Sequence, residues 1–221
     1  MGTLKENTNH SEPAALSDET VDALMTAIKH RRSMGVARLL PDPIEPVLIE
    51  QALEAADWAP SHGDTEPWRF IVYTGQARNA LGEAFAEAYR HDAERDGGFK
   101  QTTFDAQRER SQSAPVWISI GMQPAIVGDG SPKMSIEEEL MAVACAVQNL
   151  HLVASAQGLA GMWLSKGVFR HERVAQFVGL EPPHGRLLGF FVLGKPSIPW
   201  PAGERRPHHE KVQWVEVSDP V

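Results

Sequence analysis

The sequence predicts a single α+β domain in which a small β-sheet is covered by helices. Segments with the short, apolar character of strands are few, and helical segments separate them along the chain. The longest helical segment, residues 135–158, is also the most apolar element. A helix that is apolar nearly all round is a buried helix, so we expect this one at the centre of the fold.

The chain is long enough to form one core without covalent or metal cross-links. It has 221 residues, of which 42% are hydrophobic and 23% charged, and no long Pro/Gly/Ser linker divides it. A domain of this size buries about 70% of its unfolded surface, so it needs neither a disulfide nor a structural metal. We therefore expect one domain over residues 17–221, preceded by a disordered tail over residues 1–16.

Composition excludes several classes of partner. With 21 basic against 29 acidic residues the net charge is -8, which argues against binding of nucleic acid through phosphate contacts. No apolar stretch reaches the roughly 18 residues of a membrane span, and the N-terminal segment lacks the apolar centre of a signal peptide. We expect a soluble cytoplasmic protein. The single cysteine, Cys145, lies in an apolar run and is expected to be a small buried side chain.

The first half of the chain predicts two helices, a loop and a strand. Ser17 and Asp18 are N-cap candidates for a helix whose apolar residues recur with helical spacing: Val21, Leu24, Met25 and Ile28. This helix ends in the basic string KHRRS. A second helix over 46–57 begins with Pro46, a first-turn residue, and a loop leads from it to a strand over 68–74. Trp68 is expected to anchor that strand in the core.

The second half predicts the remaining elements. A third helix covers 76–92, and the polar stretch 93–112 is either a further helix or a mobile excursion. Ser135 with Glu138 forms a capping-box pattern at the start of the long helix, and Gly158 is a natural stop. Three further segments read as strands: 115–122, 186–194 and 211–217.

The usual catalytic motifs are absent, and two basic clusters remain. The sequence has no H-E-x-x-H, no P-loop, no G-x-G-x-x-G after a strand and no nucleophile elbow. HRRS (30–33) and GERRPHHEK (203–211) each supply a pair of arginines, whose planar forks suit phosphate oxygens. Two interpretations stay open: each cluster is a solvated element end, or both converge on one phosphate group.

Four segments in order resemble the FMN-dependent nitroreductase family, and the likeness is closest to its small single-domain branch. They are HRRS, WAPSHGDTEPWRFIV after the second helix, GLAGMWLSKG after the long helix, and LGKP with RRPHHEKVQW near the end. The resemblance runs from about residue 20 to 217. It implies a three-layer α+β fold with a small mixed sheet, and an intertwined homodimer whose C-terminal arm crosses to the partner subunit.

The resemblance also implies an activity. FMN would lie at the subunit interface, take hydride from NADH or NADPH at N5, and pass electrons to a nitroaromatic or quinone in a ping-pong mechanism. No protein nucleophile is needed, in agreement with the missing motifs. Two alternatives stay open: an FMN-binding protein with little NAD(P)H turnover, or a specialised flavin-fragmenting or reductive dehalogenating member.

The resemblance assigns the cofactor's phosphate to the basic residues. Arg31, Arg32 and Ser33 match the positions that hold the phosphate and the ribityl chain. A second cation from the C-terminal segment would complete the clamp, with Arg206 preferred to Arg205 and Lys195 third.

The flavin ring is assigned to two other segments. One matches the loop that reaches the flavin from the partner subunit, through Pro60, Ser61, His62 and Asp64. The other matches the segment along the ring and its polar edge, through Trp163, Leu164 and Ser165.

Three features depart from the family pattern. Many members carry a basic residue where this chain has Gly35; either Arg38 supplies that charge or the flavin is harder to reduce. Asp64 and Glu66 replace amides, and since a carboxylate cannot donate a hydrogen bond, we expect them to cap the strand entry or to pair with an arginine. The lid region 93–134 has no family motif; its aromatics, Phe99 and Phe104, are candidates for the lid, the core or the surface.

Overall fold

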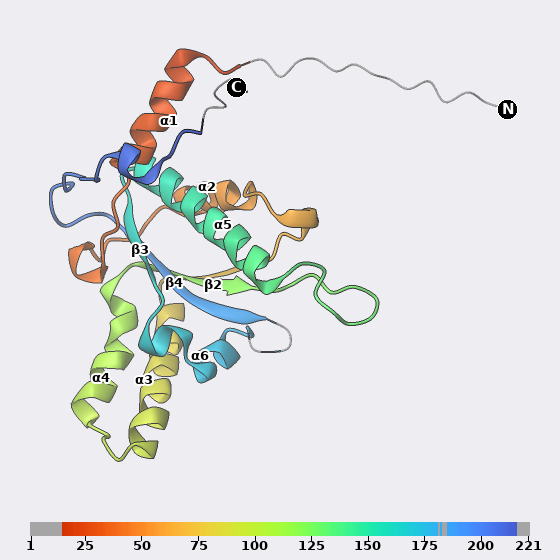
Figure 1. Ribbon diagram of the computed structural model, residues 1–221. Coiled ribbons are helices and arrows are strands. Elements are labelled where there is room, and N and C mark those ends of the chain that lie inside the picture. Colours follow the sequence, from red (N-terminus) through yellow and green to blue (C-terminus); the bar gives the residue numbers. More distant parts are fainter. Residues whose placement is uncertain (1–14, 181, 183–184, 216–221) are drawn as a thin grey trace.

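A computed structural model describes residues 15–180, 182 and 185–215 of the chain (Figure 1). Four strands form one sheet in the order β1-β2-β4-β3, with bounds β1 Trp68–Tyr73, β2 Val116–Met122, β3 Ala160–Leu164 and β4 Arg186–Gly194. The helices are α1 Asp18–His30, α2 Pro46–Asp57, α3 Ala77–Arg95, α4 Gln101–Glu109, α5 Ile136–Ala156 and α6 Glu172–Phe177. The predicted tail falls almost entirely outside the described residues.

The sheet is antiparallel throughout, whereas a mixed sheet was expected. β2 pairs with β1 and β4, and β4 pairs with β3, each time antiparallel. The parallel pairing that the described residues do contain is an isolated bridge between Ser33 and Gly161. β3 was not predicted as a strand, because its five residues include a glycine and are too few to show a period of two. Gly161 is required there, since a Cβ would collide with the Val192 carbonyl and the Phe191 ring.

Helices cover both faces of the sheet, which confirms the three-layer architecture (Figure 1). Side chains from α2 and α5 pack on one face in a cluster that includes Ile118 and Phe191. Side chains from α3 and α6 pack on the other face in a cluster that includes Trp117 and Phe190. Adjacent residues of one strand enter opposite clusters because successive side chains of a strand point to opposite faces.

The long helix α5 forms as predicted but is buried on one side only. Ser135 and Glu138 make the predicted capping box. By length and hydropathy α5 is the one described helix that could span a membrane. However, half of its most apolar 18-residue stretch is buried within the fold, as in a core helix. Its other side is exposed, with Met141 62% accessible. Cys145 lies on this exposed side and is itself exposed in the single chain. The prediction that it is buried is therefore wrong for one chain. The reason is that no element in the described part of the chain covers that face.

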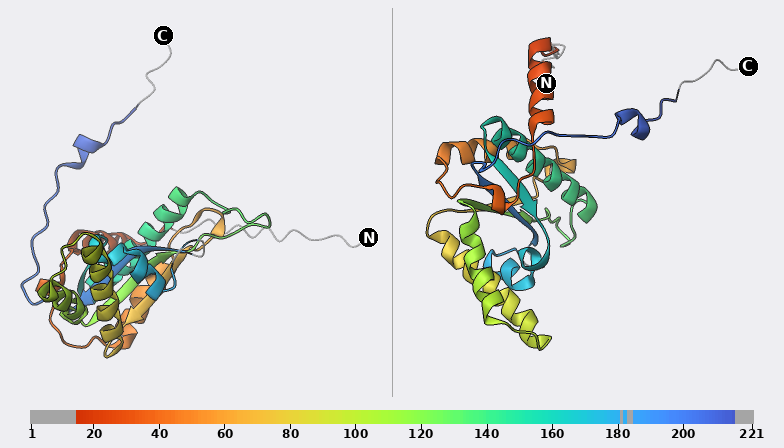
Figure 2. Two further views of the ribbon diagram at one scale, coloured as in Figure 1. Left: turned by 90° about the horizontal axis from the view of Figure 1, so that it is seen from below. Right: turned by 90° about the vertical axis from the view of Figure 1, so that its left-hand side faces the viewer.

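Helix α1 projects from the body of the molecule (Figure 2). Ser17 caps it as predicted, through its side chain to the Thr20 amide. None of its residues is buried, and its four apolar side chains are 42–53% exposed: Val21, Leu24, Met25 and Ile28. The periodicity therefore predicted the helix correctly but not what its apolar side contacts.

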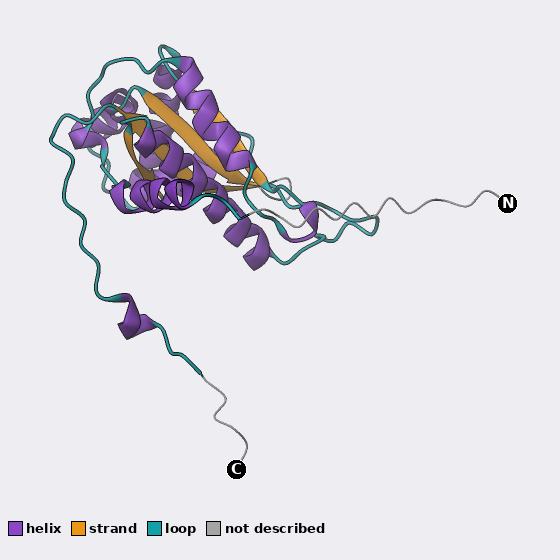
Figure 3. Cartoon of the chain, turned by 90° about the horizontal axis from the view of Figure 1, so that it is seen from above, coloured by secondary structure: helices purple, strands orange, loops and turns teal. Residues whose placement is uncertain are grey.

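The C-terminal segment leaves the domain as an extended arm (Figures 2 and 3). The strand expected over 211–217 is not formed in its described part: η5, a 3-10 turn (His208–Lys211), is followed by residues 212–215 without strand pairing. Residues 216 and 217 lie outside the described residues. An alternating pattern needs a neighbouring strand to become a strand, and residues 212–215 have none among the described residues.

The stretch 93–112 is helical except for a short connection over 96–100, which decides in favour of the helix between the two alternatives left open. α3 continues to Arg95, and α4 then packs against it. Phe104 is buried at 4% exposure, so it belongs to the core, while Phe99 remains 38% exposed beside it.

A buried histidine joins the end of α1 to α5. His151 is 6% exposed; its Nε2 lies 3.0 Å from the Arg32 carbonyl oxygen and its Nδ1 3.5 Å from an Arg31 guanidinium nitrogen. The neutral ring protonated at Nε2 satisfies both contacts, donating to the carbonyl and accepting from the guanidinium. Burial, then the charge of Arg31, lowers the pKa of His151 to about 4.

This histidine predicts a pH-dependent stability. Its pKa is near 6.5 in the unfolded chain and lower in the folded one, so the unfolded state binds more protons in between. The contribution of His151 to the free energy of unfolding is therefore fully present above pH 6.5 and is lost as the pH falls toward 4. We expect the free energy of unfolding in urea to drop by about 2 kcal/mol from this group between pH 7.5 and 5. His151→Gln keeps a donor and an acceptor without titrating, so its profile should be flatter; parallel profiles for the two proteins would contradict the assignment.

Candidate functional site

The two basic clusters of the sequence converge on one cavity. Arg31 and Arg32, at the end of α1, and Arg205, from the C-terminal segment, line a cavity of about 530 Å³. The rest of its lining is Ile28, Lys29, Gln148 and Gly203, so no acidic side chain faces it. Of the two interpretations left open, the structure supports convergence.

Arg32 fixes the C-terminal segment to the end of α1. Its guanidinium donates to three backbone carbonyls, those of Lys29 (2.6 Å), Arg31 (2.8 Å) and Pro201 (3.0 Å). Gly203 lies against this guanidinium, which would have to move if residue 203 carried a Cβ. Trp200 adds a second attachment, since its indole donates to the His30 carbonyl at 2.7 Å and stacks on the His30 ring at 4.6 Å.

Arg31 and Arg205 keep some of their donors available for a ligand; the hydrogen bond of the Arg205 side chain within the described residues goes to the Glu204 carbonyl at 2.7 Å. The contacts of the Arg31 side chain within the described residues are a hydroxyl, Ser33 Oγ at 3.3 Å, and the ring of His151. Burial lowers the pKa of Arg31, and the neighbouring charges of Arg205 and Arg32 lower it further. No carboxylate in the described part of the chain pairs with any of the three arginines. A bound anion would therefore relieve a cluster of like charges.

The other predicted cations lie elsewhere. Neither Arg206 nor Lys195 lines the cavity. The Arg206 carbonyl accepts a hydrogen bond from Lys211 Nζ, and the Lys195 carbonyl accepts one from the Leu40 amide. Arg205 thus replaces Arg206 as the better candidate for the second cation.

The segment Trp163–Ser165 lies at the end of β3 and lines a second cavity of about 460 Å³. Trp163 is half-buried, and its indole donates to the Leu188 carbonyl at 3.1 Å, so it serves as a core anchor with one accessible side. The other end of β3 adjoins the basic cluster, since the Met34 amide donates to the Gly161 carbonyl at 2.9 Å. The arginine cluster and this segment are therefore two ends of one continuous region.

The loop 59–67 lies apart from that region in the same chain. It is attached to the first turns of α5 by His62 Nδ1 to Glu138 Oε1 at 2.6 Å and by Thr65 Oγ1 to Glu139 Oε2 at 2.7 Å. His151, beside the arginines, is thirteen residues further along α5, which corresponds to roughly 20 Å at 1.5 Å per residue. Figure 1 shows the loop and α1 at opposite ends of α5. One chain does not bring all the predicted site residues together.

The two acids of this loop do not take the roles expected for them. Neither the Asp64 nor the Glu66 carboxylate has a hydrogen-bond or ion-pair partner in the described residues; Arg69 instead donates to the Glu66 backbone carbonyl at 2.8 Å. Both residues adopt left-handed backbone conformations, with φ of 53° and 43°. Aspartate and asparagine are the non-glycine residues that adopt this conformation most readily, so it suits Asp64 better than Glu66. Trp68 anchors the following strand as predicted, with its indole bonded to Asp57 at 2.9 Å.

A side chain at position 35 would fit only if Met162 shifted slightly. A Cβ on Gly35 would lie 3.2 Å from the terminal methyl of Met162. Arg38, the expected substitute, is exposed in a short 3-10 turn, η1 (Val36–Arg38). It is absent from the lining of both cavities described above.

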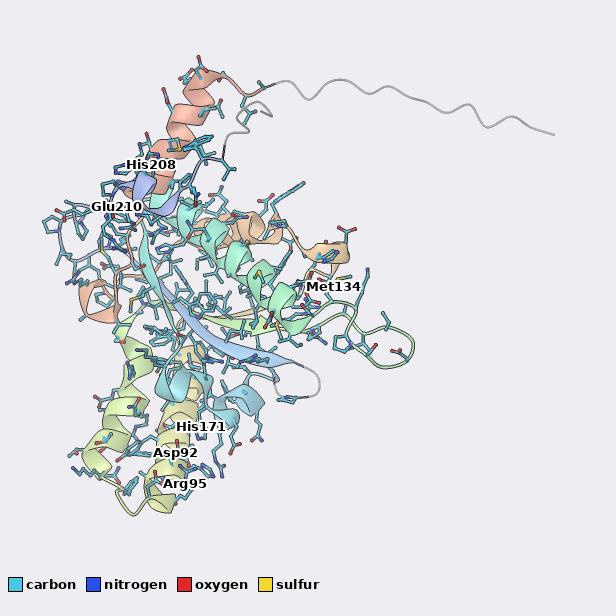
Figure 4. All side chains as sticks on the ribbon, viewed as in Figure 1. Asp92, Arg95, Met134, His171, His208 and Glu210 are labelled. Carbon is cyan, nitrogen blue, oxygen red and sulfur yellow. The ribbon has the colours of Figure 1, made fainter. Side chains whose placement is uncertain are left out.

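One group of metal-ligand residue types, which the sequence did not single out, has a structural explanation. The ligand atoms of His91, Asp92 and His171 lie within 4.8 Å of one another. Figure 4 labels Asp92 and His171. However, His171 Nδ1 accepts from the Arg173 amide at the start of α6, which leaves the proton on Nε2, 3.2 Å from Asp92 Oδ1. That hydrogen bond lowers the pKa of Asp92. The group therefore ties α6 to α3, and the ring offers no free lone pair to a metal.

Comparisons with known proteins agree with this fold. The profile of the Nitroreductase family matches residues 28–195. The Escherichia coli K12 protein named "Putative NAD(P)H nitroreductase YdjA" is 26% identical over 178 residues, covering 80% of this chain and 90% of its own. The crystal structure of a nitroreductase-like family protein from Bacillus cereus superimposes with a TM-score of 0.70 at 26% identity, covering 87% of this chain and 96% of its own. FMN-dependent nitroreductase NfnB from Mycobacterium smegmatis, solved in complex with NADPH, gives a TM-score of 0.66 at 20% identity over 89% of this chain and 100% of its own.

The three-layer architecture, the ordered sequence motifs and a family match across most of the chain lead to one conclusion. This protein belongs to the nitroreductase family of oxidoreductases.

Proposed function

We propose that this protein is an FMN-dependent oxidoreductase that transfers electrons from NADH or NADPH to an electron-poor small molecule of the nitroaromatic or quinone type. The observation that carries the proposal is the cluster of Arg31, Arg32 and Arg205 around a cavity that no carboxylate lines. A phosphate monoester, which is doubly charged near neutral pH, fits such a cluster better than any neutral group. The FMN-dependent relative NfnB and the name of YdjA support the choice of cofactor and electron donor.

The residues present fit FMN at both ends. Arg31, Ser33 and Arg205 would hold the phosphate, and Arg32 would keep the C-terminal segment in place behind it. The ring would extend along Trp163, Leu164 and Ser165, toward which β3 leads from the phosphate end. When bound, FMN supplies the two-electron chemistry, accepting hydride at N5 and passing two electrons to the acceptor in a ping-pong sequence. The chain's own task is to orient the donor and the acceptor in turn and to limit access of water.

The site is complete only with a second copy of the chain. The loop carrying Pro60, Ser61 and His62 is roughly 20 Å along α5 from the arginines of the same chain, so a partner's loop would complete the ring site. The apolar side of α1 and the exposed side of α5 are the surfaces such a partner would cover. Among the described residues β1 pairs with β2 and with no other strand, so its outer edge is open to a partner. The partner's C-terminal arm would find there the neighbouring strand that it lacks in one chain. We place this homodimer in the cytoplasm.

The direct test uses the purified protein and added FMN. We expect FMN to be retained through gel filtration and to raise the melting temperature, because a ligand that binds only the folded state stabilises it. Anaerobic mixing with NADH or NADPH should then bleach the visible flavin absorbance, and a nitroaromatic or quinone should restore it. Failure to retain FMN would reject the cofactor. Retained flavin that neither nucleotide bleaches would instead indicate a carrier with little turnover.

Arginine substitutions test the phosphate assignment residue by residue. Arg31→Ala and Arg205→Ala each remove a charged donor from the cavity, so the Kd for FMN should rise roughly 30-fold, or about 2 kcal/mol. Arg206→Ala is the matched control, since it removes the same charge from the adjacent residue outside the cavity lining. Fluorescence titration measures all three. An Arg206→Ala protein weakened as much as Arg205→Ala would show that net charge, not placement, governs binding.

A substitution on α1 tests the second copy. Leu24 is 53% exposed in one chain, so Leu24→Glu should leave the subunit folded while placing a charge in the proposed interface. We expect light scattering to show a halved mass and titration to show FMN binding weakened at least about 10-fold, the effect of an unpaired interfacial charge. Thr26→Glu, on the opposite side of the same helix, should remain dimeric. A Leu24→Glu protein that stays dimeric with unchanged FMN affinity would contradict the interface.

A further inference from the structure

The cavity beside Trp163 contains an arginine that the proposed redox site does not use. Arg110 opens the 3-10 turn η3 (Arg110–Ser113) after α4, and it lines the cavity together with Met162, Trp163, Lys166 and Phe169. This residue comes from a part of the chain in which the sequence showed no functional motif. Its position is set by tertiary packing rather than by its neighbours in sequence.

The Arg110 side chain is held in a fixed place. Its guanidinium lies over the ring of Phe169, 4.6 Å from the centroid. Phe169 is itself 4% exposed and packs edge-on against Phe85 and against Trp117 at a tilt. A cation stacked on a rigid aromatic ring loses little further freedom when it binds a ligand.

Arg110 also lacks an acceptor among the described residues. Its side chain takes part in no hydrogen bond or ion pair there, and burial alone lowers its pKa, with no carboxylate opposing the shift. The neighbouring arginines differ: Arg90 pairs with Glu87 at 3.0 Å, and Arg108 pairs with Asp105 at 3.0 Å. A half-buried guanidinium without a counter-ion is costly unless something completes its hydrogen bonds.

The rest of the cavity indicates what that ligand carries. Lys166 supplies a second cation, exposed and also without a partner in the described chain. Met162, Trp163 and Phe169 supply apolar and aromatic walls. The cavity also borders the segment Trp163–Ser165, along which the proposed flavin ring would lie.

We infer that Arg110, assisted by Lys166, forms a carboxylate-binding subsite that selects anionic aromatic acceptors over neutral ones. This inference rests on the proposed function and narrows it to a substrate class. The planar fork of arginine accepts a carboxylate through two parallel hydrogen bonds, and the aromatic walls accept the ring that bears it.

The test compares two acceptors that differ in charge but hardly in shape, 4-nitrobenzoate and 4-nitrobenzamide. The wild-type enzyme should have the higher kcat/KM for 4-nitrobenzoate. Arg110→Gln should lower the benzoate-to-benzamide ratio of kcat/KM about 10- to 100-fold, the range for a lost charge-assisted hydrogen bond, and Lys166→Gln should lower it less. Arg108→Gln, which removes an arginine paired with Asp105, is the matched control and should leave the ratio unchanged.

Other outcomes would overturn the inference. A ratio unchanged in Arg110→Gln, or an equal loss for both acceptors, would reduce Arg110 to a packing residue. If Arg110→Gln raised the KM for NADPH but not for NADH and left the benzoate-to-benzamide ratio of kcat/KM unchanged, Arg110 would instead bind the phosphate that NADPH carries and NADH lacks. Calorimetric titration with benzoate and benzamide tests the carboxylate subsite separately from the proposed FMN-dependent activity, because binding is measured without turnover. Benzoate binding lost in Arg110→Gln supports the subsite even if FMN chemistry fails, and equal binding of both probes rejects it even if FMN chemistry succeeds.

Discussion

The arrangement of the site depends on one joint, where the end of α1 meets α5 and the C-terminal segment. His151 donates a hydrogen bond to the Arg32 carbonyl, and the Arg32 guanidinium donates one to the Pro201 carbonyl. Gly203 lets the C-terminal segment pass close to Arg32, so Arg205 lines the same cavity as Arg31. The hydrogen bonds of His151 and Arg32 use backbone carbonyls and a neutral imidazole ring, so none of them neutralises the positive charge of the arginines. The joint therefore assembles a cation cluster and leaves it without a counter-ion, which is what an anion-binding site requires.

Helix α5 sets the distance between the two halves of the site. Its first turns carry the contacts of the loop with His62, and its later turns carry His151, so the helix keeps the halves roughly 20 Å apart. The same helix exposes Met141 and Cys145 on the side away from the sheet. A second copy of the chain that covers this side would bring its own loop to the first chain's arginines. It would also bury the exposed side of α5.

Arginines without a carboxylate partner in the described residues line the cavities where ligands are expected. Most arginines on α3 and α4 pair with neighbouring carboxylates, as Arg90 and Arg108 do. Arg31, Arg205 and Arg110 do not, and each lines a cavity. Because a half-buried cation without a partner is unfavourable, Arg31 and Arg110 carry more information about ligand binding than the net charge of the chain does.

The sequence by itself determined α1, α2, α3 and α5, three of the four strands, the capping box, the two basic clusters and the family, because periodicity and short motifs are local properties. It left α4 as one of two alternatives and did not predict the short helix α6. It did not reveal β3, whose five residues become a strand through pairing with β4, nor that the strand expected near the C-terminus has no neighbour within one chain. Only the tertiary structure chose Arg205 over Arg206, exposed Cys145, and placed Arg110 on Phe169 beside Trp163. These outcomes depend on contacts between segments far apart in the chain, and no local pattern encodes which of two adjacent side chains faces a cavity.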